Sequence, residues 1–458
     1  MAKDSATSWI ILFPVTLAVF LEQGMIKSFS VLLSDIKDQF STDTWVVGSS
    51  ISIIVGLGSV IGLAAEPLVR KCGARVGYMI CGLVSSIGLI VCSYAPNSLT
   101  LLLGMCCIGF LILQDIIAIG IVPDYFDSYF NTAVAIYSCG TGFGITVMPI
   151  LTQTCLDIYG WRGTCLLLSG ICMHSVPFGA LIKRSNNYEN IRSEKSPTNL
   201  SSSYEISTDK DNSLRSHCRN MLKCVFSSPL FTNVPFIAQV LVPAFVCGFT
   251  STGWLIYIVS YASSNGASLR QASVVSTCGG IGLTAVRIVL PLLQQCMTYK
   301  QLMYLASLLG TLSLAFTTQF DDFIQMSLMS GLFGISYGIL GAELYIATKY
   351  VTSEADYLSG VMWIYVINGV AGISTGFFSG WFFDTTGSFT LSFALLAAVH
   401  VVAPVSLALE EIFLKVTPSS FTGPTQKDKP VPVILGRLLR KEPRASNSDF
   451  SKLIPRPE

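Results

Sequence analysis

Five charged residues interrupt long apolar runs of this sequence, namely Glu22, Lys27, Asp115, Arg287 and Glu343. A charged side chain at the centre of a bilayer costs about 2.5–3.5 kcal/mol on insertion scales, so such residues usually face a protein interior or a watery cavity. The guanidinium of Arg287 can pair with a carboxylate through two hydrogen bonds. We therefore predict that the two cations, Lys27 and Arg287, bind a small organic anion. For Lys27 an interfacial lysine is the alternative, because it lies six residues before its run ends. For Arg287 the alternative is a structural ion pair.

The three acids, Asp115, Glu343 and Glu22, are candidates for proton coupling or for charge pairing with these cations. Their structural alternative is a hydrogen bond across a helix interface. Glu22 and Lys27 are five residues apart, which is about 140° around a helix at about 100° per residue. We therefore expect these two to face different neighbours, not to form a local pair.

The elements that hold these residues are predicted to be membrane-spanning helices. The chain of 458 residues is 51% hydrophobic and only 12% charged, whereas soluble domains average about 25% charged residues. A helix needs about 20 mostly apolar residues to cross the hydrocarbon core. Twelve such runs are present, at about 9–33, 45–65, 76–95, 99–121, 131–155, 163–182, 230–260, 270–294, 300–320, 323–347, 357–381 and 388–413. The sequence thus predicts an all-α membrane protein with twelve transmembrane helices.

A long polar segment divides the twelve predicted spans into two groups of six. This arrangement is that of the major facilitator fold, in which two six-helix bundles rock around a site near the bilayer midplane. The expected parts are an amino-terminal tail (1–8), a first bundle (9–182), a central loop (183–229), a second bundle (230–413) and a tail (414–458). The central loop and the last segment are polar, and we expect both to be mostly disordered.

The distribution of Lys and Arg predicts the orientation of the chain. With both termini in the cytoplasm, the outer segments carry only Lys37, Arg162 and Arg270 of the 28 basic residues. Cytoplasmic loops carry an excess of Lys and Arg. We therefore expect a multi-pass membrane protein with cytoplasmic termini.

Several segments resemble the monocarboxylate transporter family (solute carrier family 16). They are YGWRGTCLLLSG at 159–170, EPLVRKCGAR at 66–75, KSFSV at 27–31 and GWFFDTTGSFT at 380–390. The resemblance implies alternating-access transport of a small monocarboxylate, with Lys27 and Arg287 as substrate-binding cations. It also implies proton symport, a plasma-membrane location and a single-span immunoglobulin-type glycoprotein as a candidate partner.

The family signatures are only partly kept, which makes this chain a divergent member. The first signature falls on 4–9, where only Asp4 and Trp9 match, and the second falls on 125–144. Matches to the second include Tyr125, Phe126, Gly140 and Gly144. Proton-linked members have an aspartate one turn before the arginine of span eight, and that position is Leu283 here. Proton coupling, if present, therefore needs another acid.

Glycines in two spans are predicted to serve packing or bending. Gly372, Gly376 and Gly380 are spaced four apart, which is typical of a face that lets helices approach closely. Gly140 and Gly144 precede Pro149 within one span. We expect all five glycines to be structural.

The remaining motifs exclude several classes of protein. The 14 cysteines form no CxxC pair and the 3 histidines are scattered, so neither a metal site nor a disulfide framework is expected. No phosphate-binding loop, cofactor motif, nucleic-acid motif or enzymatic constellation is present. Two alternatives to organic-anion transport stay open. One is a uniporter for a neutral or zwitterionic solute, such as an amino acid or a creatine-like compound. The other is a non-transporting receptor or scaffold in the bilayer.

Overall fold

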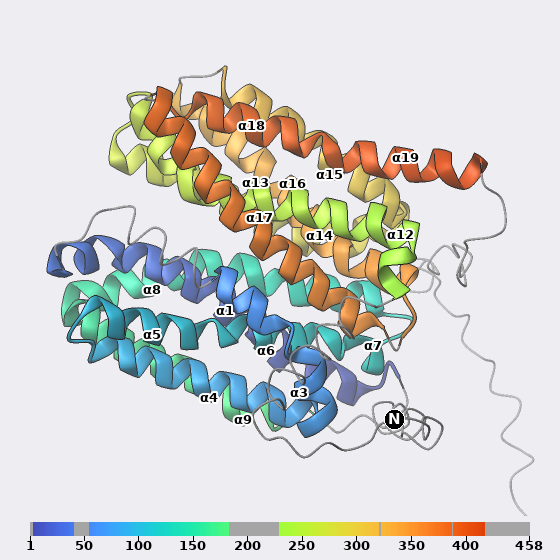
Figure 1. The fold of residues 1–458 in the computed structure, drawn as a ribbon, viewed down its shortest axis with the longest axis horizontal. Coiled ribbons are helices and arrows are strands. Elements are labelled where there is room, and N and C mark those ends of the chain that lie inside the picture. The colour runs from blue at the N-terminus through green and yellow to red at the C-terminus, as the bar shows by residue number, and fades with distance from the viewer. Residues whose placement is uncertain are drawn as a thin grey trace, which may run out of the picture. The chain divides into compact units, whose positions relative to one another are not determined.

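The computed structural model describes residues 3–40, 55–182, 229–319, 322–354, 356–386 and 388–416. All of these ranges belong to one compact unit. Throughout these ranges the regular structure is helical (Figure 1). Nine helices or helix runs there are long and apolar enough to cross a membrane.

The first half of the chain forms one group of helices. In chain order they are α1 (Ala6–Phe40), a helical segment at 55–62, α3 (Ala65–Cys72), α4 (Ala74–Ser93), α5 (Ser98–Ile108), α6 (Phe110–Gly120), α7 (Val122–Tyr125), α8 (Phe130–Met173) and α9 (Ser175–Gly179). We call this group the N half; it is drawn in blue to green in Figure 1.

The second half forms the other group, which we call the C half. It contains the 3-10 turn η1 (Pro229–Thr232), α12 (Val234–Phe236), the π-helical turn η2 (Ile237–Leu241), α13 (Val242–Ser264), α14 (Leu269–Cys296), α15 (Tyr299–Thr317), α16 (Phe323–Val351), α17 (Tyr357–Thr386), α18 (Thr390–His400) and α19 (Val402–Val416).

The predicted spans correspond closely to these helices. The run predicted at 99–121 is built from two consecutive helices, α5 and α6, and the run predicted at 388–413 is built from α18 and α19. Of the run predicted at 45–65, residues 45–54 lie outside the described ranges. So do 183–228 of the predicted central loop and 417–458 of the predicted tail.

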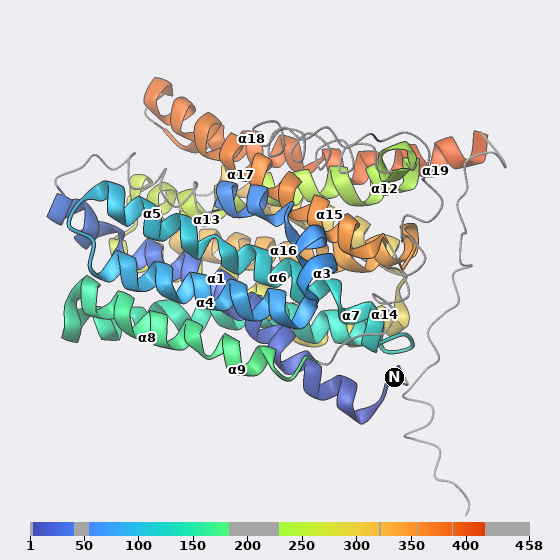
Figure 2. The same cartoon turned by 60° about the horizontal axis from the view of Figure 1, so that its bottom comes forward.

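Helix α8 contains two predicted spans joined by a tight reversal at Gly160. The backbone φ of Gly160 is 65°, a value that residues other than glycine rarely adopt. Before the reversal, the hydroxyl of Thr152 donates to Ser28 of α1. After it, residues 162 and 169 accept hydrogen bonds from Ser93 and Ser86 of α4, in reverse chain order. Figure 2 shows α8 and α9 alongside α4.

Local sequence signals fix where several helices begin. Ser268 precedes α14 and Thr298 precedes α15, and each forms a reciprocal capping box with the glutamine three residues later. Such boxes satisfy amide groups that the first helical turn leaves unpaired. The turns between these spans are therefore encoded locally.

Glycines allow close helix approaches within the N half. A Cβ at Gly140 would lie 2.6 Å from the carbonyl oxygen of Thr16, and one at Gly144 would lie 2.5 Å from that of Phe20. Both carbonyls belong to α1, so α8 can pack this closely only with glycine at these positions.

The α17 glycines have less crowded surroundings. A Cβ at Gly372 would meet Thr252 of α13 at 3.1 Å, and the Gly376 carbonyl accepts a hydrogen bond from Tyr257. Gly380 lies in the same helix. A packing role for the three remains a prediction.

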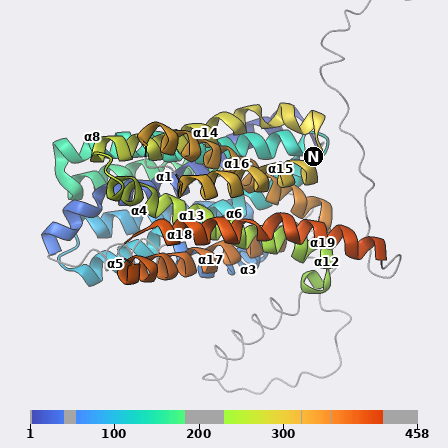
Figure 3. The ribbon, with the colours of Figure 1, turned by 90° about the horizontal axis from the view of Figure 1, so that it is seen from above.

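The two halves contact each other chiefly through two helix pairs. Helix α8 packs against α14, where Gly142 lies against Thr284, and α6 packs against α17, where Gly120 lies against Leu358. In Figure 3, α8 and α14 lie side by side along one edge. These crossings set the position of the cavity between the halves.

Candidate functional site

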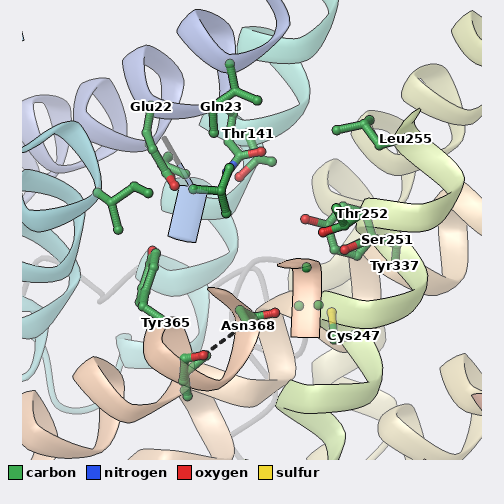
Figure 4. A pocket seen from close by; sticks show the side chains of 18 of the residues that line it. Glu22, Gln23, Thr141, Cys247, Ser251, Thr252, Leu255, Tyr337, Tyr365 and Asn368 are labelled. Carbon is green, nitrogen blue, oxygen red and sulfur yellow. Dashed lines mark hydrogen bonds between the residues drawn. The ribbon is translucent and has the colours of Figure 1, made fainter. Parts of the chain in front are cut away.

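A cavity of about 170 Å³ lies between the two halves (Figure 4). The N half lines it with α1, the segment 55–62, α6 and α8, and the C half with α13, α14, α16 and α17. Its polar lining residues include Glu22, Gln23, Thr141, Ser251, Arg287 and Asn368. Because both halves supply the wall, a ligand here would contact both at once.

Arg287 supplies a positive charge to the cavity wall. Its side chain is only 4% exposed. Nη1 donates to the carbonyl of Ser138 at 2.6 Å and Nε donates to that of Gly338 at 3.3 Å. The guanidinium also lies 5.8 Å from the ring centre of Tyr337. Within the described ranges no carboxylate forms an ion pair with Arg287.

Ser138 belongs to α8 of the N half, so the bond from Arg287 joins the two halves. One turn before the arginine, Leu283 is 2% exposed and packs against Gly338 of α16. The position where the family has its aspartate is thus an apolar helix contact in this chain.

Glu22 and Asp115 lie next to each other at the edge of the cavity. Glu22 lines the cavity from α1 and is 5% exposed, while Asp115 on α6 is fully buried. The two carboxyl groups are close enough to interact electrostatically, and Oε2 of Glu22 and Oδ1 of Asp115 are buried without a hydrogen-bond donor in the described ranges. The described contacts of Asp115 are with Glu22 and with tyrosines, not with Arg287.

Three tyrosines surround Asp115. Oδ2 of Asp115 accepts hydrogen bonds from Tyr137 at 2.8 Å and from Tyr365. The hydroxyl of Tyr345 donates to that of Tyr365 at 3.0 Å. Tyr137 comes from the N half, whereas Tyr345 and Tyr365 come from the C half. We call Asp115 and these three residues the tyrosine cluster.

Sequence reasoning missed the tyrosine cluster, although a signal for it exists. All three tyrosines lie within predicted spans, and a buried phenol usually needs a hydrogen-bond partner. Tyr137 and Asp115 lie in different predicted spans, so only the packing of the helices could bring them together.

The structure separates the remaining predicted residues from this site. Glu343 is fully buried in the C half, where it accepts a hydrogen bond from Gln294 at 2.8 Å, and it does not line the cavity. Lys27 follows Ile26, which lines the cavity, but Lys27 itself is half-buried and is not part of the wall. In the described ranges Lys27 has no hydrogen bond or ion pair.

Known proteins match this arrangement along most of the chain. A profile of the Major Facilitator Superfamily matches residues 15–364. The chain belongs to the major facilitator superfamily. The proton:xylose symporter XylE, solved with bound 6-bromo-6-deoxy-D-glucose, has the same fold. The two structures superpose with a TM-score of 0.68 at 12% sequence identity, and the superposition covers 89% of this chain and 96% of XylE.

Within the superfamily, the curated relatives are monocarboxylate transporters at low identity, which supports the resemblance seen in the sequence. Monocarboxylate transporter 12 of Mus musculus is 23% identical over 93% of this chain and 90% of its own length. The Rattus norvegicus protein of the same name is 24% identical over 89% and 86%. Monocarboxylate transporter 6 of Homo sapiens is 28% identical over 39% of this chain and 36% of its own length.

The residues kept from the two family signatures contact each other in this superfamily member. The carboxylate of Asp4 accepts hydrogen bonds from the backbone amides of Asp127 and Ser128, at 3.1 and 3.0 Å. Trp9 packs edge-on against Phe126 at 5.1 Å. Tyr125 and Phe126 are both buried. The first residues of α1 are thereby fixed to the loop that precedes α8.

The same end of this major facilitator protein carries polar contacts between the halves. Lys349 of the C half pairs with Asp127 at 3.4 Å, and Lys3 pairs with Glu354 at 2.9 Å. Ser359 donates to Glu66 at 2.7 Å. We call this end, with its three contacts, the amino-terminal end. The contacts hold the halves together there.

Neutralising two of these contacts should loosen the amino-terminal end. For the double variant Asp127→Asn with Glu354→Gln we expect a larger population in which the halves separate there. Exposed ion pairs contribute about 0.2–1 kcal/mol each, so we expect the ratio of open to closed molecules to rise by a few-fold. Spin-label distances across this end in nanodiscs would measure it. Asp157→Asn is the matched control, since Asp157 bonds only Gln153 of its own helix in the described ranges. Unchanged distances would show that these ion pairs do not hold the end closed.

Proposed function

We propose that this chain carries a small monocarboxylate or a related organic anion across a membrane by alternating access, coupled to protons. The observation that carries the proposal is Arg287, a buried cation on the wall of a cavity between the halves, with no carboxylate partner in the described ranges. A carboxylate substrate would provide that partner.

The bonds of Arg287 suggest how a substrate would act on the conformation. Its bond to Ser138 crosses between the halves, but a carboxylate is a stronger acceptor for guanidinium than a backbone carbonyl. A bound anion would therefore compete for the guanidinium and alter a contact that depends on how the halves are arranged. A ligand shifts a conformational equilibrium only through such differential contacts.

Lys27 has a second role in this proposal, as a cation on the path to Arg287. It lies on α1 five residues beyond Glu22, one position after the cavity-lining Ile26. A half-buried amine without a charged partner in the described ranges can attract an anion toward the cavity.

One observation favours a zwitterionic substrate as a second candidate. Glu22 lines the same cavity as Arg287, from the opposite half. A solute with a carboxylate and a cationic group could bind both residues. Uptake of such solutes, in preference to simple monocarboxylates, would select this candidate.

The proposal also includes the orientation of the chain in the membrane, its cellular location and a candidate partner. The excess of Lys and Arg in predicted inner loops supports placing the amino-terminal end in the cytoplasm. We propose the plasma membrane as the location and keep a single-span immunoglobulin-type glycoprotein as a candidate partner, on the family resemblance alone.

Purified protein in liposomes should take up labelled lactate or pyruvate, and an inward proton gradient should accelerate the uptake. The same liposomes should be tested with amino acids and creatine-like zwitterions. Empty liposomes and liposomes with dissipated gradients provide the baselines. Absence of uptake and of counterflow for every organic acid in the panel would contradict the proposed anion transport.

A further inference from the structure

The pair of carboxyl groups formed by Glu22 and Asp115 lacks donors for two of its oxygens. Oε2 of Glu22 and Oδ1 of Asp115 are buried without a hydrogen-bond partner in the described ranges. The remaining Asp115 oxygen, Oδ2, already accepts the hydroxyls of Tyr137 and Tyr365. Buried polar atoms are rarely left unsatisfied, so each such case in a folded protein needs an explanation.

A proton between the two groups explains the missing donors. Two adjacent carboxylates in a buried site cannot both carry a full charge, because desolvation and mutual repulsion both oppose it. One shared proton leaves a single negative charge and supplies a donor between the groups. Such a pair takes up and releases protons as a unit.

Within the part of the chain that the structure describes, no cation is bonded to the pair. Gln23 neighbours Glu22 on α1 and Gln114 neighbours Asp115 on α6. The other facing groups are tyrosines, Tyr78 from α4, Tyr137 from α8, Tyr337 and Tyr345 from α16 and Tyr365 from α17. Arg287 on α14 donates its hydrogen bonds to the backbone carbonyls of Gly338 and Ser138, and in the described ranges it donates none to the pair. The hydroxyls of Tyr137 and Tyr365, which donate to Asp115, therefore stabilise the remaining negative charge without neutralising it.

We propose that Glu22 and Asp115 together form the proton-binding site of this chain. They would take the place of the aspartate that proton-linked members of the family have at the position of Leu283. This inference rests on the proposed function. Glu22 lines the cavity, so a proton from the cavity reaches the pair through it. Binding that proton changes the charge of the pair from −1 to 0. Binding one monocarboxylate alongside it makes the whole step electroneutral.

The tyrosine cluster links this proton site to the arrangement of the halves. Tyr365 extends from the C half to Asp115 in the N half. A hydrogen bond to an ionised carboxylate is stronger than one to a neutral carboxyl group. Full protonation of the pair therefore weakens a contact between the halves and favours their separation at this point.

The transport test uses the full chain in liposomes with labelled lactate. We expect Asp115→Asn and Glu22→Gln each to abolish the stimulation of uptake by an inward proton gradient. Asp157→Asn, an exposed acid outside the cavity, is the matched control and should keep the stimulation. Stimulation that persists in both pair variants, or that is lost with Glu343→Gln instead, would overturn the proposed site.

A second measurement needs no substrate and so separates this inference from the proposed function. Infrared spectra of the purified protein at neutral pH should show a protonated carboxyl band that moves on exchange into heavy water. Either Asp115→Asn or Glu22→Gln should remove the contribution of the pair, and Glu343→Gln should keep it. A spectrum that neither pair variant changes would overturn the shared proton, even if lactate uptake is observed.

Tyr365→Phe tests the link to the C half without removing either acid. It deletes a donor that stabilises the ionised form of Asp115, so the pair should hold its proton to higher pH. The pH at which gradient-driven uptake is half-maximal should therefore rise. A midpoint that is unchanged or lower would exclude a role for Tyr365 in the proton site.

Discussion

Replacing Arg287 with alanine should reduce organic-anion uptake to background while the protein still reaches the membrane. The variant removes the cation that the proposal assigns to the substrate carboxylate. It also removes the bonds to Ser138 and Gly338. Hydrogen bonds to charged groups contribute about 1.5–3 kcal/mol each, so the loss of one substrate contact alone should weaken binding by roughly 10- to 100-fold. Uptake at several substrate concentrations, normalised to protein at the cell surface, would measure the change.

Two further variants sharpen this experiment. Arg287→Lys keeps the charge but loses the planar, bidentate geometry, so uptake should recover only in part. Arg75→Ala removes an exposed arginine outside the cavity and should leave uptake unchanged. Wild-type uptake in Arg287→Ala would remove this residue from the site. The parallel variant Lys27→Ala shows whether the second cation contributes separately.

Replacing Gly144 with valine should prevent normal folding of the N half. A Cβ at this position would lie 2.5 Å from the carbonyl oxygen of Phe20 and 3.1 Å from the amide nitrogen of Gly24. Both are backbone atoms of α1, which cannot rotate away as a side chain can. Overpacking in a tight interior costs about 1–3 kcal/mol where side chains can adjust, and we expect a larger loss here. Thermal unfolding and the monodisperse fraction in detergent would measure it.

Gly170 offers the matched control on the same helix. A Cβ there would meet nothing within 4 Å, and alanine is the better helix former by about 1 kcal/mol. Gly170→Ala should therefore be as stable as the original protein or more so. Equal stability of Gly144→Val and Gly170→Ala would contradict the close packing of α8 on α1.

Hydrophobic run length was enough to predict most of the helices. Crossing a bilayer demands long apolar segments, and that demand marks the sequence strongly. The boundaries were less predictable, because helices extend beyond the apolar part. Helix α1, for example, reaches Phe40 through polar residues, seven positions beyond the predicted end at 33.

The candidate site was only partly predictable, because partners come from helices distant in sequence. The apolar surroundings of Asp115 and Glu22 identified both as unusual, but no spacing rule could place α1 beside α6. The apolar residue at Leu283 indicated that an acid was missing. Which acid lies nearest the cavity became visible only from the packing of the N half.

The contacts between the residues of the two signatures could not be predicted from the sequence either. Asp4 and Trp9 are the surviving ends of one motif, and Tyr125 and Phe126 begin another, more than a hundred residues later. Their contact depends on α1 lying against the loop before α8. The contact between the two segments can therefore be kept even when most residues of a motif have changed.

The contacts of Lys3 and Asp4 have a practical consequence for labelled forms of this protein. Lys3 reaches Glu354 of the C half, and Asp4 holds the loop of the N half. A fluorescent protein or affinity tag fused just before these residues would lie next to contacts with both halves. Transport rates measured with such a fusion would include the effect of the tag on these contacts. Labels attached at the exposed reversal near Tyr159 and Gly160, at the opposite end, avoid this interference.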